Sequence, residues 1–245
     1  MSISPKQKND EDLYYYISRK VGDAIGDYDM ISDGDKILVA VSGGKDSMTL
    51  LEMLRYRQRF APVKYELLAL YVDMGVPGFP VDQMREHFKD IGVPLIVEQA
   101  DILKGGDWSD VNCYYCAQLR RKTLFQLADK NGCRKIALGH HLDDIVETIL
   151  MNMCYRGEIG AMCPNQEMFE GAITIIRPLA YVHEKDIIRL LEQGKTMRFE
   201  GQCPNDRASK RTFFKGIVSQ LEADDHAVKK NILKSLRNIK HEYLP

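Results

Sequence analysis

Short apolar runs rich in β-branched residues alternate along this chain with longer segments whose apolar residues recur at helical spacing. Such runs are typical of buried parallel strands, and a spacing of three or four residues is typical of amphipathic helices. The predicted strands cover residues 37–41, 65–72, 94–97, 135–138 and 174–176. Because strands and helices alternate, we predict an α/β fold with a doubly wound, mostly parallel sheet.

Helical segments without strands are predicted at both ends of this alternation. A leading helix is expected because one helical face would carry Leu13, Tyr16, Ile17, Val21, Ala24 and Ile25. Two further helices are predicted at about residues 209–221 and 224–239, where no strand pattern occurs. We therefore expect an N-terminal helical segment (1–30), an α/β domain (31–200) and a C-terminal helical extension (201–245).

The composition is that of an ordinary globular protein. The chain has 245 residues, is 44% hydrophobic and carries a formal net charge of −1, so any basic surface must be local. No apolar run approaches the roughly 18 residues that span a bilayer, and the polar start MSISPKQKNDED lacks a signal-peptide core. We expect a cytoplasmic protein without a membrane partner, in which cysteines serve more often as ligands or reactive thiols than as disulfides.

The first predicted strand leads into a glycine turn and then into a helix. The turn has the sequence SGGKDS and comprises Ser42, Gly43, Gly44, Lys45, Asp46 and Ser47. Its backbone N–H groups and the positive end of the helix dipole favour a phosphate ligand, to which the lysine adds charge and the serines add donors. A Walker A loop needs Ser or Thr after its lysine, where this chain has Asp46. The alternative is an ordinary glycine turn of an α/β domain.

A second polar string, Gly139-His140-His141-Leu142-Asp143-Asp144, follows the fourth predicted strand. Asp73 ends the second strand, so its side chain is expected at the same edge of the sheet, where ligands of doubly wound folds bind. The imidazoles and carboxylates are suited to hold a metal ion or a nucleotide. Capping of the following helix explains one aspartate equally well.

Three of the six cysteines form a candidate ligand set. Cys113 and Cys116 have the C-x-x-C spacing that lets two thiolates reach one metal site, and Cys203 follows the last predicted strand. Three thiolates are too few for a closed structural zinc site but suit an iron–sulfur cluster with one open iron. A redox pair or inert thiols are the alternatives. The remaining cysteines, 133, 154 and 163, are predicted to be buried apolar residues.

The order of these motifs resembles a known family. SGGKDS resembles the pyrophosphatase loop (PP-loop) of N-type ATP pyrophosphatases, which have an adenine nucleotide alpha hydrolase-like fold. Together with PGFP (77–80), CYYCAQLRR (113–121), LGHHLDD (138–144), RPLAYVHEKDI (177–187), a late Cys-Pro and the closing KKNILKSLRNIKHEYL, it resembles the tRNA 2-thiocytidine biosynthesis family. The resemblance runs from about residue 30 to the C-terminus. One departure is that the late motif holds only Cys203, where the family usually has two cysteines.

The resemblance implies a tRNA sulfurtransferase that adenylates a pyrimidine C2 oxygen, in an anticodon-loop cytidine, and replaces it with sulfur. It implies ATP, Mg²⁺ held by Asp46 and a [4Fe-4S] cluster held by Cys113, Cys116 and Cys203, with Lys45 as a further catalytic residue. Nucleotide contacts are implied for residues 42–47 and for Asp73, Gly139, His140, Asp143 and Asp144. The implied partners are tRNA and a sulfur donor, either a cysteine desulfurase or free sulfide. A homodimer is compatible with it.

Basic residues beside the cysteines agree with an RNA partner. They are Arg120, Arg121 and Lys122 after the cysteine pair, Arg207, Lys210, Arg211 and Lys215 after Cys203, and Lys229, Lys230, Lys234, Arg237 and Lys240 near the end. Tyr114 and Tyr115 are suited to stack on an unpaired base. For the last group a solvated helix face is an equally good interpretation. Two other functions remain open: a PP-loop ligase with an amine nucleophile, and a non-catalytic iron–sulfur or redox-sensing RNA-binding protein.

Overall fold

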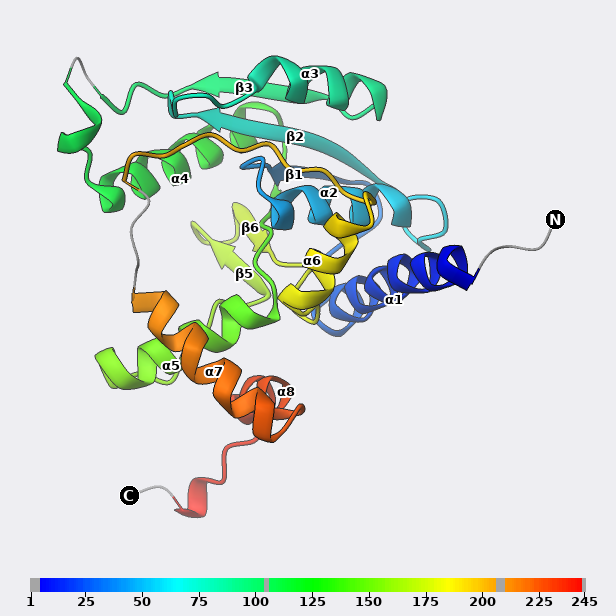
Figure 1. Cartoon of the computed structure of the whole chain (residues 1–245), viewed down its shortest axis with the longest axis vertical. Helices are drawn as coiled ribbons and strands as arrows, with labels where there is room; N and C mark the ends of the chain where they lie inside the picture. Colours follow the sequence, from blue (N-terminus) through cyan, green and yellow to red (C-terminus); the bar gives the residue numbers. More distant parts are fainter. Residues whose placement is uncertain (1–4, 104–105, 206–209, 244–245) are drawn as a thin grey trace.

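A six-stranded sheet forms the centre of the molecule in the computed structural model, which describes residues 5–103, 106–205 and 210–243 (Figure 1). The strands are β1 (Asp35–Ala40), β2 (Tyr65–Asp73), β3 (Leu95–Gln99), β4 (Lys135–Ala137), β5 (Asn165–Met168) and β6 (Ile173–Ile176). Their order is β3-β2-β1-β4-β6-β5, and every neighbouring pair is parallel except β5 with β6. The predicted mostly parallel α/β fold is confirmed.

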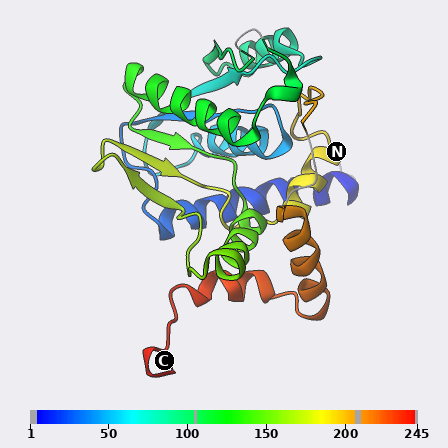
Figure 2. The same ribbon diagram turned by 90° about the vertical axis from the view of Figure 1, so that its left-hand side faces the viewer.

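Helices cover both faces of the sheet. They are α1 (Pro5–Asp27), α2 (Lys45–Arg57), α3 (Val81–Asp90), α4 (Cys113–Lys130), α5 (Leu142–Arg156), α6 (Glu184–Glu192), α7 (Lys210–Asp224) and α8 (Val228–Ser235). Side chains alternate along β1, so Ile37 and Val39 join the core beneath α1, α2 and α6, whereas Leu38 joins the core beneath α4. Figure 2 shows the sheet between α4 on one side and the N-terminal helices on the other.

The edge strand β5 was not predicted from the sequence. Its residues, Asn-Gln-Glu-Met, lack the apolar β-branched pattern because this strand lies at the sheet edge and is only partly buried. It pairs antiparallel with β6 through a turn in which Phe169 and Glu170 have φ of 53° and 56°. The sheet therefore has six strands where five were expected.

The two ends of the chain behave largely as expected. Leu13, Ile17, Val21 and Ala24 of α1 are buried against the core. The C-terminal helices α7 and α8 lie beside α5 at one end of the molecule (Figure 1), where Val218 packs on Leu142 and Val146. The last helix ends at Ser235, earlier than the expected 239. In the described part of the chain, no helix combines the length and apolar character needed to cross a bilayer.

Candidate active site

The strand order reverses direction between β1 and β4, which makes their carboxyl ends a topological switch point. From β1 the chain continues outward through β2 and β3, and on the other side β4 is followed by β6. Loops that leave adjacent strands at such a point diverge and leave a crevice for a ligand. Here those loops are residues 41–44, before α2, and residues 138–141, before α5.

The nucleotide loop, residues 42–47, is closed by its own serines. The amide of Ser42 donates to Ser47 Oγ at 3.1 Å, the amide of Gly44 donates to Ser42 Oγ at 3.3 Å, and Ser47 Oγ donates to the Gly44 carbonyl at 3.0 Å. The helix α2 begins directly afterwards, at Lys45, with Gly44 as its N-cap. The first amides of a helix have no intrahelical acceptor and face outward along the axis, which suits an anionic ligand.

Two glycines are required by close approaches to this loop. Gly43 has φ of +86°, and a Cβ there would lie 2.6 Å from the carbonyl oxygen of Phe199. A Cβ on Gly139 would lie 2.9 Å from the backbone nitrogen of Ser47. Any side chain at Gly139 would therefore push the loop after β4 away from the start of α2, and the crevice between the two loops would change shape.

Lys45 lies between two carboxylates. Its Nζ atom is 3.0 Å from Asp46 Oδ1 and 3.2 Å from Glu184 Oε1. Burial alone would lower the pKa of Lys45, but the charges and hydrogen bonds of Asp46 and Glu184 outweigh it and raise that pKa, so the side chain is a cation. Asp46 Oδ1 is buried, and among the described residues its contacts are ion pairs, with Lys45 Nζ at 3.0 Å and with His141 Nε2 at 3.7 Å, without a hydrogen bond of regular geometry. A buried carboxylate oxygen beside a phosphate site is suited to bind Mg²⁺.

The two histidines of the second loop have different surroundings. His141 is buried and caps α5, accepting from the amide of Asp144 while its own amide donates to Asp144 Oδ2. His140 Nδ1 accepts a hydrogen bond from Arg177 Nε at 3.3 Å. Burial, with the positive charge of Arg177 adding to it, lowers the pKa of His140 to about 4. His140 is therefore neutral at pH 7, with its proton on Nε2.

The aspartates of this loop face the C-terminal helices. Asp143 Oδ1 lies 2.5 Å from Lys229 Nζ of α8, and Asp143 Oδ2 accepts from the amide of Glu184 at 2.8 Å. Asp144 Oδ1 lies 2.5 Å from Arg211 Nη1 of α7. The nucleotide contacts implied for these two aspartates stay predictions, because both carboxylates are here engaged in joining α5 to α7 and α8.

The three candidate cysteines are brought together although Cys203 is far from the others in sequence. The Cys113 thiol donates to the backbone carbonyl of Asn205 at 3.9 Å, so the loop that carries Cys203 lies against the start of α4. Burial raises the pKa of the Cys116 thiol, and the nearby thiols of Cys203 and Cys113 raise it further against the opposing charge of Arg120. Cys113 and Cys203 are exposed and Cys116 is partly buried, which leaves the group open to solvent.

These thiols are not arranged to share a single metal ion. Within the described ranges, no three His, Cys, Asp or Glu side chains are close enough to hold one ion. In an iron–sulfur cluster each thiolate ligates a different iron, so the sulfurs stand farther apart than ligands of one ion. Three solvent-open thiols from two segments are suited in chemistry and number to the iron–sulfur cluster expected from the sequence.

The remaining cysteines correct one prediction. Cys133 is buried as expected, with 1% of its surface exposed. Cys154 and Cys163 were expected to be buried and are exposed. Cys154 lies near the end of α5, and Cys163 lies before the edge strand β5, where neither side chain faces a core. Helical context alone did not indicate which face of α5 was covered.

Asp73 ends β2 as predicted, and its Oδ1 accepts from the amide of Gly75. It lines a cavity of about 590 Å³ together with Val81, Asp82, Arg85, Val97, Glu98 and Gln99. None of residues 42–47 lines this cavity, so it does not itself contain the nucleotide loop.

The basic residues after Cys203 are less available than expected. Arg211 pairs with Asp144, Lys215 Nζ lies 2.6 Å from Glu184 Oε2, and Lys229 is buried between Asp143 and Glu222. Lys229 is therefore not part of a solvated or RNA-facing helix surface. Arg207 lies outside the described residues. Tyr114, beside the cysteine pair, is 72% exposed, as a base-stacking surface requires.

The sequence analysis did not single out several polar residues that build this site. They are Arg177, Glu184 and Asn205, together with the pairing roles of Arg211 and Lys229. Arg177 and Glu184 lie in the string RPLAYVHEKDI, which was noted only as part of a resemblance. An arginine directly after a buried strand and an acidic first helical turn were available signals. Asn205 gave no local signal, since both of its acceptors are about 90 residues away.

Comparison with known proteins gives a consistent picture. A family model described as a PP-loop domain matches residues 13–221. The tRNA-cytidine(32) 2-sulfurtransferase of Geotalea uraniireducens is 41% identical over 238 residues, which cover 95% of this chain and 94% of that protein. The protein of the same name from Geobacter metallireducens is also 41% identical, over 96% of this chain and 94% of its own length.

A solved structure shares the fold. The U34-tRNA thiolase NcsA from Methanococcus maripaludis, solved with its [4Fe-4S] cluster, superposes with a TM-score of 0.77. The match covers 96% of this chain and 81% of that chain, at 23% identity. At that identity the likeness shows a common fold and nothing more specific.

Proposed function

Since the chain belongs to the PP-loop family and, within it, to the tRNA-cytidine(32) 2-sulfurtransferase family, we propose that it replaces the C2 oxygen of a tRNA cytidine with sulfur. The relatives carry this activity in their names, which specify cytidine 32 of tRNA. The reaction needs two sites that open onto one substrate: one that activates the oxygen with ATP and one that presents sulfur.

The observation that carries the proposal is the link between those two sites. The amide of Phe199 donates to the carbonyl of Gly43 in the nucleotide loop at 2.8 Å. Cys203 follows only four residues later, and an extended chain spans at most about 14 Å over four residues. Cys203 therefore lies within about 14 Å of the residue bonded to the nucleotide loop, which supports a substrate that reaches both sites.

Activation would use the nucleotide loop. The pyrimidine C2 oxygen attacks the α-phosphorus of ATP, so an oxygen–phosphorus bond forms while the bond to pyrophosphate breaks and carries its electron pair away. Lys45 and the N-terminal amides of α2 offset the negative charge that builds on the phosphate oxygens. Asp46 would hold Mg²⁺, which neutralises phosphate charge when bound. Neutral His140 can donate a hydrogen bond through Nε2 without adding a charge.

Sulfur insertion would use the three cysteines. Cys113, Cys116 and Cys203 would hold a [4Fe-4S] cluster, which when bound offers one iron without a protein thiolate, open to a sulfide ligand. Sulfide, taken from solution or released by a thiol reductant from the persulfide of a cysteine desulfurase, adds to C2, and AMP leaves with the electron pair of the C2–oxygen bond. The exposed ring of Tyr114 stands beside the cysteine pair, where stacking would hold the target base.

The test uses anaerobically purified full-length protein with ATP, unmodified tRNA and sulfide. We expect AMP and pyrophosphate in equal amounts with one 2-thiocytidine per turnover, measured by nucleotide chromatography and nucleoside mass spectrometry. Lys45→Ala should slow turnover by about 10²- to 10³-fold, the usual cost of removing a charge-stabilising donor, while the iron content stays the same. ADP and phosphate as products would overturn the adenylation step. An aminated nucleoside in place of the thiolated one would show that the nucleophile is an amine and not sulfide.

A further inference from the structure

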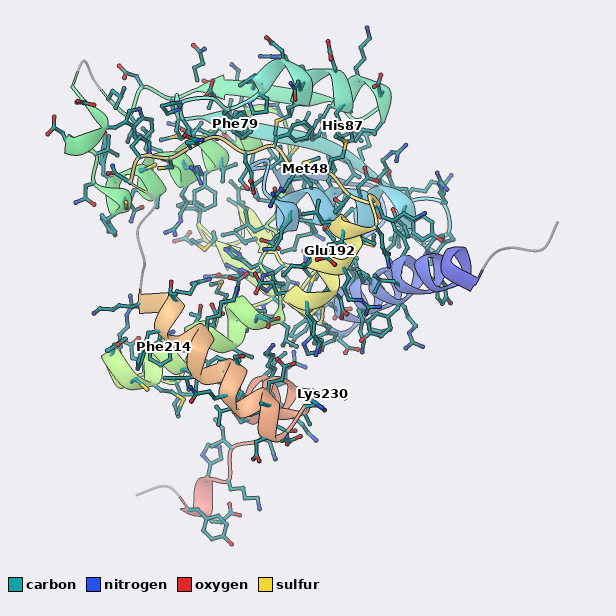
Figure 3. The ribbon with its side chains drawn as sticks, viewed as in Figure 1. Met48, Phe79, His87, Glu192, Phe214 and Lys230 are labelled. Carbon is teal, nitrogen blue, oxygen red and sulfur yellow. The ribbon has the colours of Figure 1, made fainter. Side chains whose placement is uncertain are left out.

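Residues 199–205 form a strap that crosses from the nucleotide loop to the cysteine site. At its start Phe199 is bonded to Gly43, and in its middle the amide of Gln202 donates to the carbonyl of Pro77 at 3.0 Å. Phe199 also packs on His87, with 5.7 Å between ring centroids, and His87 and Phe79 are both labelled close to the strap in Figure 3. The first half of the strap is therefore anchored to the α/β domain.

The second half of the strap is anchored through one side chain. The amide nitrogen of Asn205 donates to the carbonyl of Trp108 at 2.7 Å and to the carbonyl of Val111 at 3.2 Å. These carbonyls belong to the short turn Trp108–Asp110 and the residue after it, immediately before α4. The backbone carbonyl of Asn205 in turn accepts from the Cys113 thiol. Asn205 thus contacts the segment that begins the C-x-x-C helix on both its side-chain and main-chain sides.

Among the described residues next to Cys203, Asn205 makes the side-chain hydrogen bonds that anchor this half of the strap. Cys203 is exposed, and Pro204 has no backbone N–H with which to donate. Two donors on one planar amide are needed to reach two carbonyls at once, and among side chains of this length only asparagine has them. Alanine has none, and an ionised aspartate would place two acceptors against two carbonyl oxygens.

We propose that Asn205 is a positioning residue that holds Cys203 beside the Cys113–Cys116 pair. The role of this residue in cluster binding rests on the proposed function, because an open cluster needs three thiolates close together. The position of Cys203 does not depend on that function, since it is set by contacts within the polypeptide. It can therefore be measured in apoprotein, independently of cluster content or turnover.

The experiment is disulfide trapping in the full-length apoprotein. Wild type and Asn205→Ala are treated briefly with diamide, and cross-links of Cys203 to Cys113 or Cys116 are quantified by peptide mass spectrometry. Two neutral hydrogen bonds contribute about 1 kcal/mol each, so we expect the cross-linking rate to fall by about tenfold or more. Asn205→Asp, which keeps the size of the side chain and loses the donors, should behave like the alanine variant.

Asn165 supplies a matched control. Its side-chain amide also donates to two consecutive backbone carbonyls, those of Tyr28 and Asp29, at 2.8 Å and 3.2 Å, but far from the cysteines. Asn165→Ala should leave the cross-linking rate unchanged. Equal rates in wild type and Asn205→Ala, or an equal fall in Asn165→Ala, would overturn the proposal.

A second measurement separates this proposal from the proposed function. After anaerobic reconstitution, Asn205→Ala should bind less iron per chain than wild type and Asn165→Ala. If wild type binds no iron while trapping still depends on Asn205, the cluster assignment fails and the positioning role stands. If wild type and Asn205→Ala bind iron equally and cross-link equally, the positioning role fails and the cluster assignment stands.

Discussion

The nucleotide loop and the cysteine site are built in opposite ways. The serine hydrogen bonds that close the nucleotide loop join residues at most five positions apart, and the long-range backbone bond from Phe199 to Gly43 adds the strap to a turn that is already closed. The contacts that close the cysteine site join residues 92 to 97 positions apart. The first can form as soon as β1 and α2 meet, whereas the second exists only after the chain has returned from β6 through the strap.

The start of α5, like the cysteine site, is held by contacts between residues that are far apart in the sequence. Asp144 is paired with a residue 67 positions away, and Asp143 with one 86 positions away. Both cations come from the C-terminal helices, so α7 and α8 are held by charge as well as by the apolar contacts of Val218. A substitution within the nucleotide loop should therefore affect nucleotide binding or activation alone. A substitution that removes a long-range contact can release the strap or the C-terminal helices from the α/β domain.

The largest expected effect separates the two sites completely. Cys203→Ala should reduce tRNA thiolation below detection, because the third thiolate is lost, while AMP and pyrophosphate formation stays within a few-fold of wild type. Nucleoside mass spectrometry and pyrophosphate release measure the two half-reactions on the same sample. Lys45→Ala is the reciprocal control, with activation lost and iron retained. Loss of both half-reactions in Cys203→Ala would mean that the sites do not act independently.

The next effect concerns stability. Lys229 is 5% exposed and lies 2.5 Å from both Asp143 Oδ1 and Glu222 Oε2. Lys229→Ala leaves two carboxylates without their shared cation, and removing one partner of a buried pair costs about 3–5 kcal/mol. We expect the free energy of unfolding, from urea titration followed by circular dichroism, to fall by about that amount.

Lys230 is the control for this change. It is the next residue of α8, its side chain is exposed, and it is labelled in Figure 3. Lys230→Ala should change the unfolding free energy by less than about 0.5 kcal/mol. Similar losses in the two variants would show that helix propensity, and not the buried charge cluster, sets the stability of α8.

The same contrast explains how much could be predicted from the sequence. The strand before residue 42, the glycine turn and the start of α2 were all predictable, because their causes are short-range: apolar β-branched residues, glycine and helical spacing. The C-x-x-C pair and the alternation of strands and helices were predictable for the same reason. The face of α1 that is buried followed from its periodicity.

What could not be predicted depends on contacts between distant segments. No local pattern shows that Lys229 would be buried or that Asn205 would reach the turn at Trp108. The strand β5 was missed because an edge strand needs no apolar alternation. Cys154 was placed in a core because its helix was predicted correctly while the covered face of that helix was not.

The smallest expected effect tests whether the long-range site responds to pH in a way that the nucleotide loop cannot. Burial raises the pKa of Glu147 from 4.5 to about 7, against the nearby charge of Arg211, whose Nε lies 3.9 Å away. Between pH 4.5 and 7 the folded state therefore holds a proton that the unfolded state releases, and this contribution to stability is lost as pH rises through 7. The serine hydroxyls that close the nucleotide loop do not titrate in this range.

Glu147→Gln removes this dependence because the amide cannot ionise. Relative to wild type, we expect the variant to have the same unfolding free energy near pH 4 and to be more stable at pH 8 by about 3 kcal/mol, the equivalent of the pKa shift of Glu147. Urea titrations at several pH values measure the difference in unfolding free energy between the two proteins. His140 is present in both, so its opposite contribution cancels in this difference. If the variant is less stable at pH 8, the attraction of Arg211 outweighs the cost of burying the Glu147 charge. Arg211 would then hold α5 at neutral pH through Glu147 as well as through Asp144.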